Sequence, residues 1–121
     1  MRLASSTDNL PSSERGAVGL STYYVCDLNE QNRADELLST VLAPVYDAHI
    51  GDGMYNSWAW QSHFVGGQYR RLATFTAEDY PTLLRTRGLV QETIADNEAA
   101  QFNQICTSHS DYLWDIQLET P

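Results

Sequence analysis

The stretch Trp58-Ala59-Trp60-Gln61-Ser62-His63-Phe64-Val65-Gly66-Gly67-Gln68-Tyr69-Arg70-Arg71 decides the fold of this chain. A glycine pair lies between two strand-like runs, and this pattern predicts a tight β-hairpin with both glycines in the turn. The pairs on one face are then Trp58 with Phe75, Trp60 with Ala73, Ser62 with Arg71, and Phe64 with Tyr69. The pairs on the other face are Ala59 with Thr74, Gln61 with Leu72, and His63 with Arg70. The hairpin therefore has an aromatic face suited to a core and a polar face with a histidine beside an arginine.

Arg71 is the unusual residue of the aromatic face. We expect its guanidinium to reach solvent or to bind an acidic side chain on a helix. A deeply buried Arg71 would argue against the register.

The composition limits the classes of function. The chain has 121 residues, enough for one domain, and a formal net charge of −9 with a pI near 4.5. This acidity disfavours binding to nucleic acids and to anionic membrane surfaces, and the sequence has no apolar run long enough for a membrane span. We expect a flexible segment over residues 1–16 and a single domain over 17–121. No hydrophobic signal segment begins the sequence, so a cytoplasmic protein is the default expectation.

The rest of the chain supplies two helices and two more strands. A β-branched and tyrosine-rich run predicts a strand over 18–26, and an apolar stripe predicts a helix capped by Asn29 and stopped by Gly51, with a kink at Pro44. The hairpin strands fall near 54–65 and 68–76. A capping-box spacing over 76–79 predicts the start of a second helix with a break near Gly88. The last strand is expected over 112–118, with Tyr112 and Trp114 on the side opposite Asp115.

The element order β-α-β-β-α-β is typical of the ferredoxin-like α+β fold, an antiparallel four-stranded sheet with two helices on one face. Over residues 18–118 this order and length resemble the dimeric α+β barrel superfamily, which includes antibiotic-biosynthesis monooxygenase-like, stress-responsive barrel and NIPSNAP-like proteins. The resemblance implies a homodimer in which two sheets pack face to face around a cavity. RNA-recognition modules share the plan, but they stack bases on aromatics of the open face, and here the hairpin aromatics lie on the other face.

The open face of the predicted sheet carries the first candidate site. His63 is a candidate general base, and Arg70 across the hairpin is a candidate stabiliser of negative charge. Gln61, Asp115 and either Tyr23 or Tyr24 are candidate ligand contacts. The alternative for His63 is a hydrogen-bonded histidine at a dimer interface.

A second cluster is expected at one end of the sheet, where Cys26, Cys106, His109 and Asp111 meet. The only two cysteines predict a disulfide across 80 residues, which would indicate an exported protein. Reduced buried cysteines are the alternative, and a zinc site with His109 and His63 is another. Asp111 is placed to orient the imidazole of His109, although aspartates at turns also bind backbone N–H groups.

Three functions follow from these patterns. The first is binding of a small apolar or aromatic ligand in a sheet-face cavity, with the cofactor-free oxygenase or isomerase chemistry that the resemblance implies. The second is a non-catalytic protein–protein interaction module that uses the sheet face as its interface. The third is a metal-binding protein. No nucleotide-binding or hydrolase motif is present, and no cofactor is expected.

Overall fold

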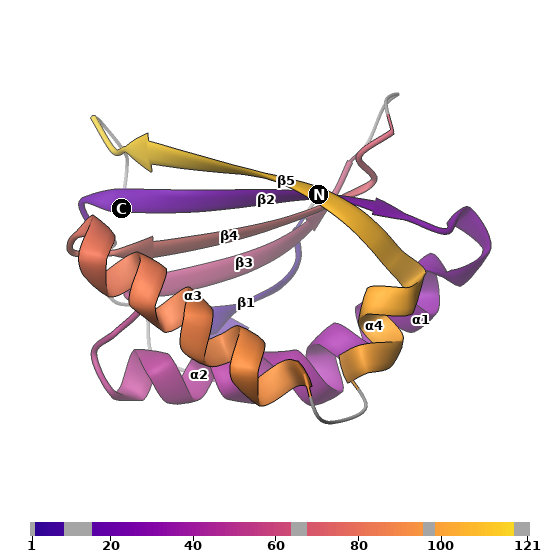
Figure 1. The fold of residues 1–121 in the computed structure, drawn as a ribbon, viewed down its shortest axis with the longest axis horizontal. Coiled ribbons are helices and arrows are strands. Elements are labelled where there is room, and N and C mark those ends of the chain that lie inside the picture. Colours follow the sequence, from indigo (N-terminus) through magenta and orange to yellow (C-terminus); the bar gives the residue numbers. More distant parts are fainter. Residues whose placement is uncertain (1, 9–15, 64–67, 96–98, 118–121) are drawn as a thin grey trace.

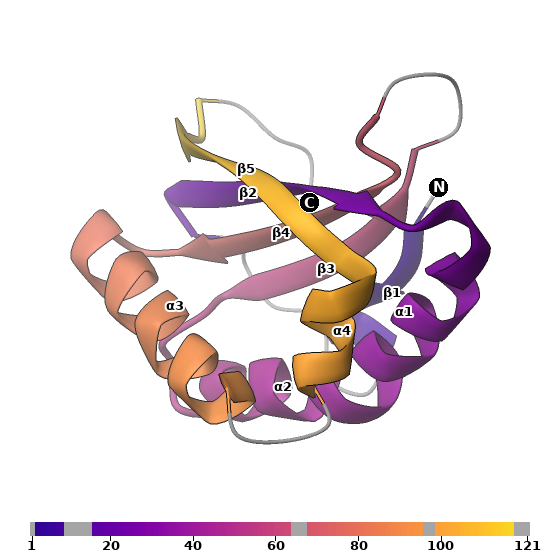
Figure 2. The ribbon, with the colours of Figure 1, turned by 45° about the vertical axis from the view of Figure 1, so that its right-hand side comes forward.

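The computed structural model describes residues 2–8, 16–63, 68–95 and 99–117. Its sheet has five antiparallel strands in the order β1-β3-β4-β2-β5 (Figure 1). Their bounds are β1 Arg2–Ser5, β2 Val18–Cys26, β3 Ser57–Ser62, β4 Arg71–Ala77 and β5 Cys106–Asp115. The helices are α1 Gln31–Leu37, α2 Ala43–Gly51, α3 Tyr80–Ala95 and α4 Ala99–Ile105. All four cover the same face of the sheet (Figure 2). Within the described part of the chain, no helix is long and apolar enough to cross a membrane.

The predicted hairpin register is confirmed. Trp58 pairs with Phe75, Trp60 with Ala73, Gln61 with Leu72 and Ser62 with Arg71. The aromatic face is buried against the helices, with Trp60 only 1% exposed. Phe64 and the glycine turn lie outside the described residues.

Helix carboxylates anchor this aromatic face. The indole Nε1 of Trp60 donates to Oδ1 of Asp35 at 2.9 Å, and the indole of Trp58 donates to Asp47 at 2.8 Å. Arg71 is buried and binds the same Asp35 through two hydrogen bonds. The expectation that burial of Arg71 would contradict the register was therefore wrong, because a helix acid compensates its charge.

The predicted sheet of four strands lacks one strand that the structure contains. Residues 2–5 form an additional edge strand, β1, which pairs with β3, and the turn that follows, Ser6–Asp8, is a 3-10 helix. The predicted flexible lead-in thus contains regular structure at its start. β1 covers the edge of β3, which would otherwise present unpaired backbone groups.

The last strand begins earlier than predicted and its faces are reversed. β5 starts at Cys106, directly after α4, and its register pairs Leu20 with Leu113 and Val18 with Asp115. Directly opposed residues share a sheet face, and Leu20 is buried beneath the helices. Asp115 therefore lies on the helix side, where it accepts a hydrogen bond from Tyr80. Tyr112 and Trp114 lie on the open side.

The helices also differ from the prediction in detail. The π-helical segment Leu38–Leu42 joins α1 to α2, which places Pro44 in the first turn of α2, where its missing N–H is tolerated. Asp27, rather than Asn29, caps the short 3-10 helix that precedes α1. The cap of α3 is Asp79, whose carboxylate accepts from the N–H of Thr82. α3 continues through Gly88 without a break.

Candidate functional site: a pocket between the sheet and the helices

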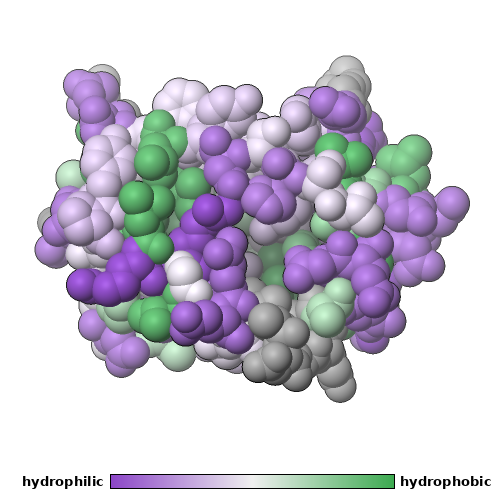
Figure 3. All heavy atoms as spheres, in the orientation of Figure 1, coloured by the Kyte–Doolittle hydropathy of each residue, from purple (hydrophilic) through white to green (hydrophobic). Residues whose placement is uncertain are grey.

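A pocket of about 410 Å³ lies between the helix side of the sheet and helices α2, α3 and α4. Figure 3 shows the surface hollowed between α3 and α4. Its size falls in the range of small-molecule sites, about 300–1,000 Å³. The open sheet face, on which the sequence placed the first candidate site, is on the other side of the molecule.

One part of the lining is apolar and aromatic. It consists of Leu42, Tyr46, Tyr55, Phe75, Val90 and Phe102. Tyr46 and Phe75 meet edge to face with ring centroids 4.9 Å apart, and Tyr55 stacks on Phe75 at 5.0 Å. These contacts hold the rings against one another and make this part of the lining apolar.

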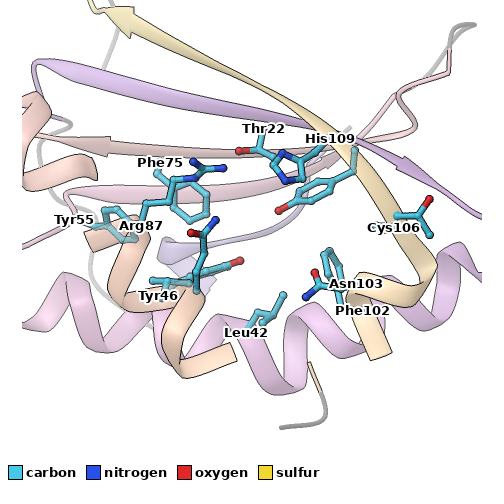
Figure 4. A pocket seen from close by; sticks show the side chains of 14 residues that line it. Thr22, Leu42, Tyr46, Tyr55, Phe75, Arg87, Phe102, Asn103, Cys106 and His109 are labelled. Atoms are coloured by element: carbon cyan, nitrogen blue, oxygen red, sulfur yellow. The ribbon is translucent and has the colours of Figure 1, made fainter. Parts of the chain in front are cut away.

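The other part of the lining is polar and comes from β2, β5, α3 and α4. It consists of Thr22, Tyr24, Arg87, Gln91, Asn103, Thr107 and His109 (Figure 4). Two members of this group, Arg87 and His109, are joined by Asp111, which lies outside the lining. Nδ1 of His109 lies 3.2 Å from Oδ1 of Asp111, and Nη2 of Arg87 lies 2.6 Å from Oδ2 of the same carboxylate.

Local structure explains how the side chains of His109, Asp111 and Arg87 come together. His109 and Asp111 are two residues apart on β5 and therefore project from the same face of the strand. Arg87 reaches Asp111 from α3 and, like His109, lines the pocket. Asp111 thus bridges a strand and a helix.

Three tyrosine hydroxyls border the pocket as hydrogen-bond donors. Burial, then the nearby Asp111 carboxylate, raises the pKa of Tyr24 to about 12, against a smaller opposing effect of Arg87. Burial also raises the pKa of Tyr46 and of Tyr55 well above the ordinary tyrosine value. All three side chains therefore keep their protons at neutral pH. No hydrogen bond joins these hydroxyls to another side chain or to the backbone in the described part of the chain.

The disulfide forms part of the same wall. The Sγ atoms of Cys26 and Cys106 are 2.08 Å apart, at bonding distance, and Cys106 lines the pocket. The backbone N–H of Asp27 donates to the carbonyl of Ile105 beside it, at 2.9 Å. Together these bonds tie the end of α4 to β2. They also engage both thiols, which removes the zinc alternative, and the described residues contain no cluster of three metal-ligating side chains.

The residues that the sequence assigned to the first candidate site do not line this pocket, apart from Tyr24. His63 and Arg70 are paired as predicted, with the N–H of His63 donating to the carbonyl of Arg70 at 3.0 Å, but neither lines the pocket. The imidazole of His63 is exposed, with Nδ1 2.9 Å from the carbonyl oxygen of Tyr69. Gln61 lies on the open face and Asp115 on the helix side, outside the pocket lining. A role for these four residues in binding or chemistry stays a prediction.

Of the two tyrosines of the first strand, Tyr24 lines the pocket and Tyr23 lies on the open face. Tyr24 packs against Trp60 and Phe102 with ring centroids 5.7 and 5.5 Å away. Tyr23 meets Tyr112 at 5.6 Å on the other side of the sheet.

The open face has a character of its own. The residues that β2, β3, β4 and β5 direct to this side are small, hydroxyl-bearing, amide, aliphatic or aromatic, and none of them is charged. Its largest exposed side chains are Tyr112 and Trp114, each about half exposed. Charge on this side of the sheet lies at its margins, where Arg2 of β1 is opposite Gln61 and Arg70 precedes β4.

The sequence prediction missed most of the pocket. Arg87, Gln91 and Asn103 had no motif to mark them, because they converge only when α3 and α4 pack beneath β5. The signal that was available is the His-x-Asp spacing at 109–111, which placed His109 and Asp111 in the second cluster.

Comparison with known proteins supports the fold. No protein-family model and no curated protein matches this chain. Among solved structures, it is similar to a dimeric ferredoxin-like protein from an uncultured marine organism, with a TM-score of 0.60 and 15% identity. The match covers 85% of this chain and 95% of that chain. Likeness at this identity concerns the fold alone. The chain has a ferredoxin-like α+β fold.

Proposed function

We propose that the pocket between the sheet and α2, α3 and α4 binds a small aromatic molecule that carries an anionic group. The observation that carries this proposal is that one pocket combines aromatic rings with hydrogen-bond donors. Phe75 and Tyr55 supply apolar ring surface, and Arg87 and the hydroxyls of the lining tyrosines supply donors.

The polar groups favour an acceptor-rich ligand. The hydroxyls of Tyr24, Tyr46 and Tyr55 are protonated at neutral pH and have no hydrogen-bonded protein partner among the described residues. Arg87 uses Nη2 for Asp111, which leaves its other N–H groups for a ligand. A carboxylate satisfies several such donors at once.

Isothermal titration calorimetry with 1-naphthoate tests the proposal, with 1-naphthylmethanol as the neutral comparison. We expect 1-naphthoate to bind more tightly than the alcohol. Arg87→Gln should weaken 1-naphthoate binding about tenfold, equivalent to ~1.4 kcal/mol. The affinity for 1-naphthylmethanol should stay unchanged.

Arg85→Gln is the matched control, because Arg85 is an exposed arginine on the same helix outside the pocket. Its affinity for 1-naphthoate should equal that of the unmodified protein. Equal losses of 1-naphthoate affinity in the two variants, or no binding of either compound, would contradict the proposal.

A second function, self-association through the open sheet face, is supported by the lack of charge on the residues that β2, β3, β4 and β5 direct to that face. Interfaces are depleted of charged residues at their centre and enriched in aromatic ones. The solved structure with a similar fold is described as dimeric, and the dimeric α+β barrel resemblance implies sheet-to-sheet packing. The occupant is a second copy of this chain.

Two neighbouring residues of β5 provide the test. Tyr112 on the open face is 51% exposed, and Leu113 on the helix side is 47% exposed. We expect analytical ultracentrifugation to show a dimer that Tyr112→Lys dissociates and Leu113→Lys does not. A monomeric unmodified protein would rule out this second function.

A further inference from the structure

The hydrogen bond between His109 and Asp111 fixes which nitrogen of the imidazole carries a proton. A carboxylate only accepts hydrogen bonds, so Nδ1, which lies 3.2 Å from Oδ1 of Asp111, must donate. In the neutral imidazole the lone pair then lies on Nε2. No side chain or backbone group of the described residues is hydrogen-bonded to Nε2. His109 lines the pocket, so a ligand there has access to a proton acceptor (Figure 4).

Arg87 holds this pair in place. Its Nη2 contacts Oδ2 of Asp111 at 2.6 Å, and the two side chains are 28% and 27% exposed. The ion pair restricts the rotation of the Asp111 side chain, so the carboxylate stays aimed at Nδ1 of His109. When the imidazole takes up a second proton, the same carboxylate stabilises the positive charge.

We propose that His109 is a general base that removes a proton from a carbon next to the carbonyl of an aryl-substituted 2-oxo acid. This inference rests on the proposed function, because it names the substrate class of the same pocket. The aryl group matches the rings of Phe75 and Tyr55, and the carboxylate matches Arg87. The ketone oxygen matches the tyrosine hydroxyls, which stay protonated.

The reaction is a keto–enol isomerisation. The proton of the C–H group moves to Nε2 of His109, and the electron pair of that bond forms the C=C bond. The carbonyl π pair moves to oxygen, where tyrosine O–H groups stabilise the developing enolate. Return of a proton from the imidazolium to the oxygen gives the enol, and return to carbon restores the ketone. No electrons are gained or lost, so the reaction needs no oxidant or reductant.

Proton exchange of phenylpyruvate in D2O tests the inference. Proton NMR follows loss of the methylene signal, and calorimetry on the same sample measures phenylpyruvate binding. We expect the protein to accelerate exchange above the buffer rate, and we expect His109→Gln to reduce this acceleration about 100-fold, within the usual contribution of a general base.

Asp111 is a positioning residue in this scheme, so Asp111→Asn should also slow exchange. The variant should lower the exchange rate at saturating phenylpyruvate and leave the affinity for phenylpyruvate unchanged. A purely structural role would weaken binding as well. Arg85→Gln, outside the pocket, should behave as the unmodified protein.

The outcomes separate the two proposals. Binding of phenylpyruvate without accelerated exchange overturns the general base and leaves the binding site intact. Acceleration that survives His109→Gln overturns the role of His109. Binding of 1-naphthoate but not of phenylpyruvate overturns the substrate class, and binding of neither overturns the proposed function as well.

Discussion

Arg71 and Asp35 form a two-point ion pair between the sheet and the first helix. Nε of Arg71 lies 2.8 Å from Oδ1 of Asp35, and Nη2 lies 2.9 Å from Oδ2. The same carboxylate accepts the indole N–H of Trp60. One helix acid therefore compensates a buried charge and fixes the orientation of a core aromatic.

Asp35→Asn should destabilise the protein strongly, because the buried Arg71 loses its counter-charge. We expect the free energy of unfolding in urea to fall by ~2–3 kcal/mol, below the cost of breaking fully buried pairs, since the Asp35 side chain is 25% exposed. Glu36→Gln is the control on the same helix, because its partner Arg33 is exposed. A similar loss in both variants would mean that Asp35 has no special role.

Gly88→Ala should stabilise the protein. Gly88 lies inside α3, and a Cβ added there has no heavy atom within 4 Å. Alanine restricts the unfolded chain and favours the helix, so we expect a gain of ~0.5–1 kcal/mol in urea unfolding. The opposite result is expected for Gly16→Ala, whose Cβ would lie 2.0 Å from the carbonyl oxygen of Ala77. A destabilised Gly88→Ala would argue against a continuous α3.

Alkaline pH should destabilise the fold through the buried tyrosines. The pKa of Tyr24 rises from 10.0 to about 12 in the folded protein. Below pH 10 this side chain is protonated in both states and has no effect. Between about pH 10 and pH 12 the unfolded chain releases the proton and the folded chain keeps it, so stability falls as pH rises.

Urea unfolding at a series of alkaline pH values measures this effect. Tyr24→Phe should lose less stability over that interval than the unmodified protein, whatever its stability at neutral pH. Identical slopes would show that Tyr24 titrates alike in the folded and unfolded chain.

The Cys26–Cys106 bond should be detectable and stabilising. Without reductant, the denatured chain should be two hydrogens lighter than the sum of its residues with free thiols. Because the bond closes a span of 80 residues, replacing both cysteines by serine should lower the free energy of unfolding by ~2–4 kcal/mol. Full thiol mass in freshly purified, unreduced protein would contradict the bond.

The part of the fold that depends on local pattern could be predicted. The strand over Val18–Cys26 and the register from Trp58 to Ser62 follow from alternation of side chains and from the glycine pair between the two runs in the sequence. The cysteine pair followed from the topology, which brings the end of β2 beside the start of β5. Each of these features is visible in neighbouring residues or in the order of elements.

The candidate site required information that the pattern of β5 does not contain. Tyr112, Leu113 and Trp114 are consecutive, large and apolar, and each is about half exposed in the structure. Such a run has no preferred face, so its orientation was assigned the wrong way. The register with β2 decides it, because Leu20, directly opposite Leu113, is buried beneath the helices.

The sequence by itself determined the hairpin register and the cysteine partners, because alternation of side chains and topology act over short or fixed connections. The tertiary structure alone decided which face of β5 meets the helices, and with it the placement of His109 and Asp111 beside Arg87. That decision depends on packing between segments far apart in the chain, where burial of an opposed neighbour, rather than local propensity, selects the orientation of a strand.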